Sequence, residues 1–269
     1  MSEVRMEYLR PEQLVAEKQR RSLVFLPIGP LEWHGPHLPL GVDMLLAHEI
    51  AVRLAQNVGG VVHPALFCGT ERERPPQMLR YLGFQGHEWI VGMDFPANSV
   101  HSLYYPEETL GLMLRESLSL LVEQGYRLIA IVNGHGAENQ IATVQRLAAA
   151  FTAQGRARVV VLLPFPVETD EEGRVSTSAG HADLYETSAM MALHPGVVHL
   201  DALPPPDQPL RNLDHAIVDS ATFSGNPTPD FTVRPERDPR RASAGTGEAQ
   251  LEEILARLTE QMGEAMAVL

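Results

Sequence analysis

The sequence predicts an α/β fold in a single layered domain, with a mostly parallel sheet flanked by helices. Three observations support this prediction. Short apolar runs alternate with amphipathic stretches over the first two-thirds of the chain, which is the pattern of βαβ units. The apolar runs contain few polar residues, as strands buried on both faces do. No internal repeat or low-complexity linker interrupts the 269 residues, so we expect residues 1–269 to form one domain.

The first strand is expected near the N-terminus, between two helices. Residues 11–20 form a short helix opened by Pro11, because proline at the first helical position loses no hydrogen bond. Residues 22–29 are apolar and closed by proline and glycine, which is typical of a buried strand. Residues 44–58 have the helical period and stop at Gly59.

The middle of the chain repeats the alternation. Residues 60–66 form a second apolar run, in which Pro64 disfavours a central position in the sheet. Residues 106–123 have the helical period. Residues 127–132 are the clearest buried strand, and residues 141–154 follow as a strong helix. A parallel sheet results if each helix returns the chain to the same edge.

The remaining regular elements are a strand at 157–163 and a closing helix at 251–268. Two long stretches lack any sustained period: 69–105, rich in Gly, Arg, Pro and aromatic residues, and 203–240, which holds eight of the 21 prolines. Long irregular segments in a compact domain are functional loops, lids or subunit contacts, or else solvated excursions.

Composition limits the function classes. Hydrophobic residues make up 44% and charged residues 20% of the chain, which excludes intrinsic disorder. Lys and Arg number 21 against 34 Asp and Glu, and the net charge of −13 argues against nucleic acid or an anionic membrane as a partner. The single cysteine, Cys68, excludes an internal disulfide framework. With neither a long apolar span nor a signal-peptide core, we expect a soluble cytoplasmic protein.

The first chemically informative segment is 32–43, directly after the first predicted strand. Glu32 and His34 are two residues apart, so both project to one side of an extended loop. Asp43 follows at the start of the next helix. Open α/β sheets bind ligands at the carboxyl ends of their strands. Two carboxylates and an imidazole at this place suit a divalent transition metal.

The second segment, 133–139, follows the strand at 127–132. Its glycines permit positive φ and let the backbone pass close to a ligand, and His135 should lie beside the first cluster. Glu138 is either another ligand or an ordinary first-turn carboxylate facing the helix dipole. A phosphate-binding loop is disfavoured, because no third spaced glycine and no Lys-Ser/Thr pair is present.

The third segment holds His181 and Glu186 at the start of a helical stretch. Taken alone, these two are best explained as a satisfied loop histidine and a helix N-terminal carboxylate.

Together the three motifs resemble the creatininase (creatinine amidohydrolase) family. The matching patterns are E-x-H-G-x-H-L-P-x-x-x-D at 32–43, N-G-H-G at 133–136 and H-A-x-x-x-E-T-S at 181–188, with a looser match at 238–247. The resemblance implies a cytoplasmic α/β metallohydrolase with two divalent ions, zinc and/or manganese with iron also admitted, commonly assembled as a hexamer.

The resemblance also implies roles for single residues. Glu32, Asp43 and His135 look like ligands of one ion, and His34 with a bridging Asp43 like ligands of the other.

Creatininase completes its second site with a Glu two residues after the strand-end His, whereas here the spacing to Glu138 is three. We expect Glu138 to reach the metal if the intervening turn tightens, which leaves His181 and Glu186 as the catalytic proton-transfer pair. The alternative is Glu186 as the ligand, with His181 as the remaining acid.

Departures from creatininase bear on the substrate. That enzyme has a Tyr after the strand-end His, and Trp residues around its substrate; here Gly136 and Thr177 are found, and the only tryptophans are Trp33 and Trp89. We therefore expect a metal-dependent hydrolase that cleaves an amide or cyclic amide of a small molecule other than creatinine.

Two other functions stay open: ring-opening C–C hydrolysis of a cyclic polyol ketone, and non-catalytic metal binding. Arg72, Arg74 and Arg80 either contact an oxygen-rich substrate or pair with neighbouring Glu71, Glu73 and Glu88. We also expect a homo-oligomer, with the proline-rich segment 203–240 docked on a neighbouring subunit.

Overall fold

The main sheet has five strands, and every strand pair in it is parallel. The computed structural model describes residues 3–165, 167–169, 175–177, 180–218, 222 and 225–268. The strands are β1 (Leu23–Gly29), β2 (Val61–Val62), β3 (Leu66–Phe67), β4 (Leu128–Asn133) and β5 (Arg158–Leu162). Their order is β2-β1-β4-β5, and β3 also pairs with β1. The mostly parallel sheet predicted from the sequence is confirmed.

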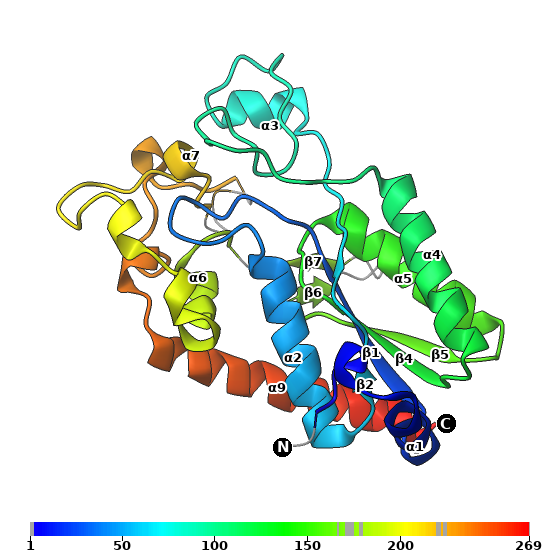
Figure 1. Cartoon of the computed structure of the whole chain (residues 1–269). Helices are drawn as coiled ribbons and strands as arrows, with labels where there is room; N and C mark the ends of the chain where they lie inside the picture. The colour runs from blue at the N-terminus through cyan, green and yellow to red at the C-terminus, as the bar shows by residue number, and fades with distance from the viewer. Residues whose placement is uncertain are drawn as a thin grey trace.

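Helices cover both faces of this sheet (Figure 1). The α-helices are α1 (Pro11–Arg20), α2 (Val42–Val58), α3 (Pro76–Tyr81), α4 (Glu107–Glu123), α5 (Glu138–Ala153), α6 (Leu184–Leu193), α7 (Asn212–His215) and α9 (Ala244–Ala267). Phe25 of β1 packs in one core with α2 and α9, whereas Val24 and Leu26 pack in a second core with α4 and α5. Burial of β1 on both faces explains why its sequence is apolar throughout.

Short elements complete the described chain. An antiparallel hairpin is formed by β6 (Val167–Thr169) and β7 (Val175–Thr177). Five 3-10 helices lie at Met6–Tyr8, Pro195–Val197, Leu200–Ala202, Pro229–Phe231 and Pro239–Arg241. Among the described residues, no helix combines the length and hydropathy needed to cross a membrane.

Three predicted elements differ most from the observed ones. The run at 60–66 divides into β2 and β3 around Pro64, whose ring nitrogen has no hydrogen to donate to a ladder. Helix α5 begins at Glu138 rather than at 141. Helix α9 begins at Ala244 rather than at 251, because the Ser243 side chain accepts a hydrogen bond from Thr246 N and caps it.

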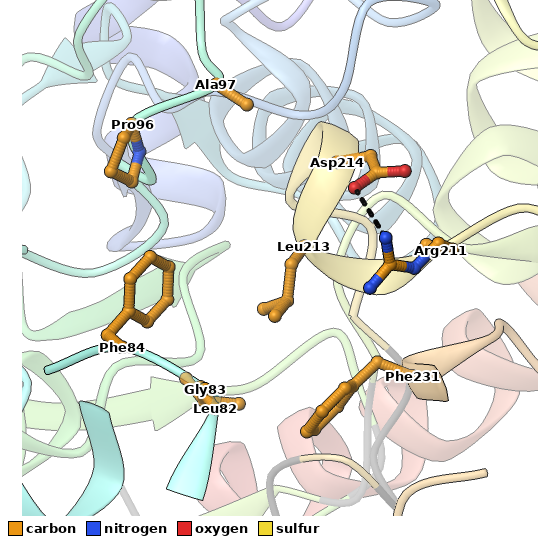
Figure 2. A pocket seen from close by; sticks show the side chains of 9 residues that line it. All are labelled: Leu82, Gly83, Phe84, Pro96, Ala97, Arg211, Leu213, Asp214 and Phe231. Atoms are coloured by element: carbon orange, nitrogen blue, oxygen red, sulfur yellow. Dashed lines mark ion pairs between the residues drawn. The ribbon is translucent and has the colours of Figure 1, made fainter. Parts of the chain in front are cut away.

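The two irregular segments pack on each other at the end of the molecule where α3 and α7 lie (Figure 1). Between them is a hollow of about 360 Å³. Figure 2 shows Phe84 and Pro96 of the first segment facing Leu213 and Phe231 of the second, with an ion pair between Arg211 and Asp214. Much of the proline-rich segment therefore packs on its own chain.

Candidate metal centre

The loop after β1 carries Glu32 and His34 over the end of the sheet. Glu32 N donates to Leu40 O at 2.8 Å, which closes the loop, and its carboxylate is buried. The His34 ring is also buried, with Nδ1 3.0 Å from the Glu32 carbonyl oxygen. Asp43 follows in the first turn of α2. All three residues predicted in this loop thus lie together.

His135 reaches the same place from the neighbouring strand, β4. Ile28 of β1 is in register with Asn133, and Gly134 N donates to Ile28 O at 3.0 Å. The Gly134 φ is not positive; a Cβ there would overlap the backbone carbonyl of Asp43. A glycine is needed at this position because two backbones meet.

The first group of candidate ligands is Glu32, Asp43 and His135. His135 Nδ1 lies 2.9 Å from Asp43 Oδ2 and 3.1 Å from Glu32 Oε2. One donor atom from each residue lies within 4.8 Å of the others. All three side chains are buried.

The second group is His34, Asp43 and Glu186, again with donor atoms within 4.8 Å of one another. His34 Nε2 lies 3.3 Å from Asp43 Oδ1 and 3.7 Å from Glu186 Oε2. Asp43 therefore faces one group with Oδ2 and the other with Oδ1. This is the arrangement of a carboxylate that bridges two ions.

His181 lies beside both groups. Its ring is 4.3 Å from the His34 ring, and Nδ1 lies 4.0 Å from Glu32 Oε2. Nε2 is 2.5 Å from the backbone carbonyl of Trp33, so the ring donates there. One donor atom from each of Glu32, His34 and His181 also lies within 4.8 Å of the others, as in the two groups above.

Glu138 is not brought to the cluster, in contrast to the expected arrangement. Its side chain is 61% exposed and forms an ion pair with Arg72 at 2.6 Å. The expected geometry required a tight turn after His135, but Ala137 is extended, with φ −60° and ψ 125°. Helix α5 starts only at Glu138, so its carboxylate points to the surface. The carboxylate beside His34 is that of Glu186.

Burial and close charges shift the acid–base properties of the cluster. Burial raises the pKa of Glu186 to about 8. Burial disfavours the cation of His34, but the carboxylates of Glu186 and Asp43 raise the pKa of this imidazole to about 10. Burial opposes the charge on Glu32, yet the surrounding imidazoles hold its pKa well below the usual value. The pKa of His181 falls to about 4 because of burial and nearby His34.

These residues fit divalent metal ions. Three carboxylates and three imidazoles meet here, and all but Glu186 are buried, where an uncompensated charge is costly. His34 Nε2 and His135 Nε2 are buried without a hydrogen-bond partner. A proton on His34 occupies a position that a cation would take, so metal binding should release protons.

The cluster opens into a cavity of about 740 Å³. Its lining includes Arg72 and Arg74 from the first irregular segment and Arg237 from the second, whereas Arg80 is not part of it. Of the groups anticipated to pair within 69–105, Arg72 forms an ion pair with Glu138, Glu73 accepts from Trp89 Nε1, and Glu88 accepts from backbone amides.

Sequence reasoning missed two features of the site. Tyr104 donates to Glu32 Oε1 at 2.5 Å, and Arg237 bonds the buried Asp183 at 3.0 Å while stacking on Tyr185 at 4.6 Å. Tyr104 and Arg237 lie in segments without periodicity, so no pattern indicated them. Only Asp183 has a recognisable sequence signal: it lies at the N-cap of α6, and Asp is a preferred capping residue.

Comparisons with known proteins agree with this geometry. The model of the creatininase family, described as creatinine amidohydrolase, matches residues 7–262. A creatinine amidohydrolase of Pseudomonas putida is 28% identical over 263 residues, covering 90% of this chain and 89% of that protein.

Two solved structures share the fold. A structure described as creatininase with Mn has a TM-score of 0.66 at 23% identity, covering 98% of this chain and 99% of that one. A mutant creatininase of the Zn–Zn type has a TM-score of 0.65 at 22% identity, with the same coverage.

Proposed function

The chain belongs to the creatininase family of metal-dependent hydrolases, and from this premise we propose that it hydrolyses the C–N bond of an amide or cyclic amide in a small molecule other than creatinine. The observation that carries the proposal is the position of Asp43. Its two oxygens face two different groups of candidate ligands, as a two-metal hydrolase requires.

We propose ligands on the basis of the donor set. Glu32, Asp43 and His135 would hold one ion, and His34, Asp43 and Glu186 the other. Mixed carboxylate and imidazole ligands suit zinc and manganese, the metals named for the related creatininase structures. When bound, two such ions supply a nucleophilic hydroxide at neutral pH and polarise a carbonyl.

His181 is the residue proposed to move the proton. Its Nε2 donates to the Trp33 carbonyl, which leaves Nδ1 as the acceptor of the neutral ring. The low pKa of about 4 keeps the ring neutral at pH 7. His181 lines the cavity, so Nδ1 can accept a proton there and return it to the leaving amine.

The cavity supports a substrate other than creatinine. At about 740 Å³ it lies in the upper part of the usual range for small-molecule sites, roughly 300–1,000 Å³, and exceeds the need of one small planar ring. Neither tryptophan lines it among the described residues: Trp33 is buried in a core and Trp89 is exposed.

A second candidate is ring-opening C–C hydrolysis of a cyclic polyol ketone. The arginines at 72, 74 and 237 favour it, because they line the cavity and guanidinium groups bind oxygen-rich substrates. The same ligand set would serve both reactions.

A turnover screen separates these candidates. The protein, loaded with Zn²⁺ or Mn²⁺, is offered cyclic amides, formamides, short peptides, cyclic polyol ketones and creatinine. Release of an amine from an amide other than creatinine supports the proposal. Preferred turnover of creatinine overturns the substrate assignment, C–C cleavage supports the second candidate, and tight metal binding without any turnover indicates a non-catalytic protein.

Assembly and location complete the proposal. We propose a cytoplasmic homo-oligomer, by analogy with the family's common hexamer. The acidic net charge of −13 and the single buried cysteine suit that compartment.

A further inference from the structure

The two oxygens of Glu32 have different surroundings. Oε1 accepts a hydrogen bond from the Tyr104 hydroxyl at 2.5 Å. Oε2 faces the imidazoles, 3.1 Å from His135 Nδ1 and 4.0 Å from His181 Nδ1. One oxygen is therefore held away from the candidate metal position while the other faces it.

The hydroxyl of Tyr104 is itself held by its neighbours. Its hydroxyl lies 3.4 Å from Met93 N, and a Cβ on Gly92 would come within 2.6 Å of that hydroxyl. The ring stands 6.1 Å from the His135 ring. A side chain with so few alternative positions can fix the carboxylate that it contacts.

The backbone around Tyr104 is attached to the metal loop. Leu103 N donates to Leu31 O at 2.7 Å, and Trp33 N donates to Ser102 Oγ at 2.9 Å. Ser102 Oγ in turn donates to Asp94 Oδ1 at 2.7 Å. Residues 102–104 are therefore hydrogen-bonded to residues 31–33, the loop that carries Glu32.

We propose that Tyr104 is a positioning residue which makes Glu32 a one-oxygen ligand through Oε2 and thereby sets the affinity of the first metal site. The inference rests on the proposed function, since it requires an ion at the group Glu32, Asp43 and His135. A phenol that occupies Oε1 prevents the carboxylate from rotating into a two-oxygen contact. Hydrogen bonds to ligating groups commonly contribute 10–100-fold in metal affinity.

The test compares Tyr104→Phe with the matched control Tyr105→Phe. The first variant keeps the ring and loses only the hydroxyl, whereas the Tyr105 side chain is 42% exposed and adjoins the same segment. Both dissociation constants for Co²⁺ are measured by chelator competition, together with the Co²⁺ absorption spectrum. We expect Tyr104→Phe to weaken one site about 10–100-fold, change its spectrum and leave the other site unchanged. Tyr105→Phe should match the wild type.

A double-mutant cycle distinguishes positioning from general stability. If Tyr104 acts through Glu32, the Tyr104→Phe change should have little further effect on Co²⁺ affinity in a Glu32→Gln background. Additive losses in the cycle, or a wild-type spectrum and affinities in Tyr104→Phe, would overturn the inference and leave the proposed function standing. A wild-type protein that binds no divalent metal would overturn both.

Discussion

Glu186 Oε2 lies 3.7 Å from His34 Nε2, inside the group that also contains Asp43. The carboxylate comes from the first turn of α6, whose N-cap is Asp183. Ala182 N donates to the same Oε2 at 2.5 Å and fixes its direction. The second group of candidate ligands is thus completed from α6, and Glu138 on α5 remains at the surface.

Exchanging each of these carboxylates for an amide tests the assignment. We expect Glu186→Gln to lose one of two metal equivalents, because a neutral amide is a much weaker ligand for Zn²⁺ or Mn²⁺. Glu138→Gln should keep both, since only its exposed ion pair with Arg72 is lost. Metal content is measured on both variants after identical loading. The reverse pattern would restore Glu138 as the ligand.

Asp43→Ala should have the largest effect on metal binding. Its two oxygens face both groups, so removing them should release both ions and nearly all hydrolytic activity. Asp201→Ala is the control, because that carboxylate is 90% exposed and lies outside the cluster. Two metal equivalents and normal turnover in Asp43→Ala would contradict a shared ligand.

The parts of the site that sequence analysis could predict are those fixed by the sheet. Glu32 and His135 follow adjacent parallel strands, and the carboxyl ends of such strands meet at one edge. Glu186 was predicted first as a proton-transfer residue and only alternatively as the ligand beside His34, because the position of α6 depends on packing against α9 and not on strand order. Tyr104 arrives through an irregular segment held by single hydrogen bonds, which no periodicity encodes.

His37 should make the folded state sensitive to acid. It is buried with Nε2 2.9 Å from Thr187 Oγ1, and burial lowers its pKa to about 3. Below a pH of about 6.5 this ring becomes protonated in the unfolded chain, whereas it stays neutral in the folded chain. The unfolded state therefore binds more protons, and stability must fall as pH falls through this range.

The corresponding experiment measures unfolding by urea for wild type and His37→Gln between pH 7.5 and 5, both with EDTA. Below pH 6.5 the free energy of unfolding of the wild type should fall by about 1.4 kcal/mol per pH unit more than that of the variant. The other buried histidines are common to both proteins and cancel in the difference. Parallel curves would show that His37 does not stay neutral in the folded state.

The exposed apolar side chains are relevant to assembly. Trp89, Leu103, Leu112 and Leu120 are each more than half exposed, and we propose that some of them are covered in subunit contacts. We expect light scattering at micromolar concentration to give a multiple of the 29.6 kDa chain mass, six-fold by family resemblance. A mass near that of one chain would exclude a stable oligomer.

The contact between Gly134 and Asp43 makes the site depend on a backbone atom. A Cβ at Gly134 would overlap the carbonyl of Asp43. The overlapping atom belongs to the main chain, so no side-chain rotation can relieve the clash. Forcing such an overlap costs about 1–3 kcal/mol or more. Because Asp43 must shift to relieve it, metal binding should suffer together with stability.

We therefore expect Gly134→Ala to lower the free energy of unfolding by about 1–3 kcal/mol and to bind less than two metal equivalents. Gly263→Ala is the matched control: Gly263 lies in α9, is exposed, and has nothing within 4 Å of an added Cβ. That variant should gain about 0.5–1 kcal/mol, because glycine in a helix interior is less favourable than alanine. Urea unfolding and metal content are measured on both. If Gly134→Ala kept wild-type stability and both ions, Asp43 would not need this close backbone contact to hold its position.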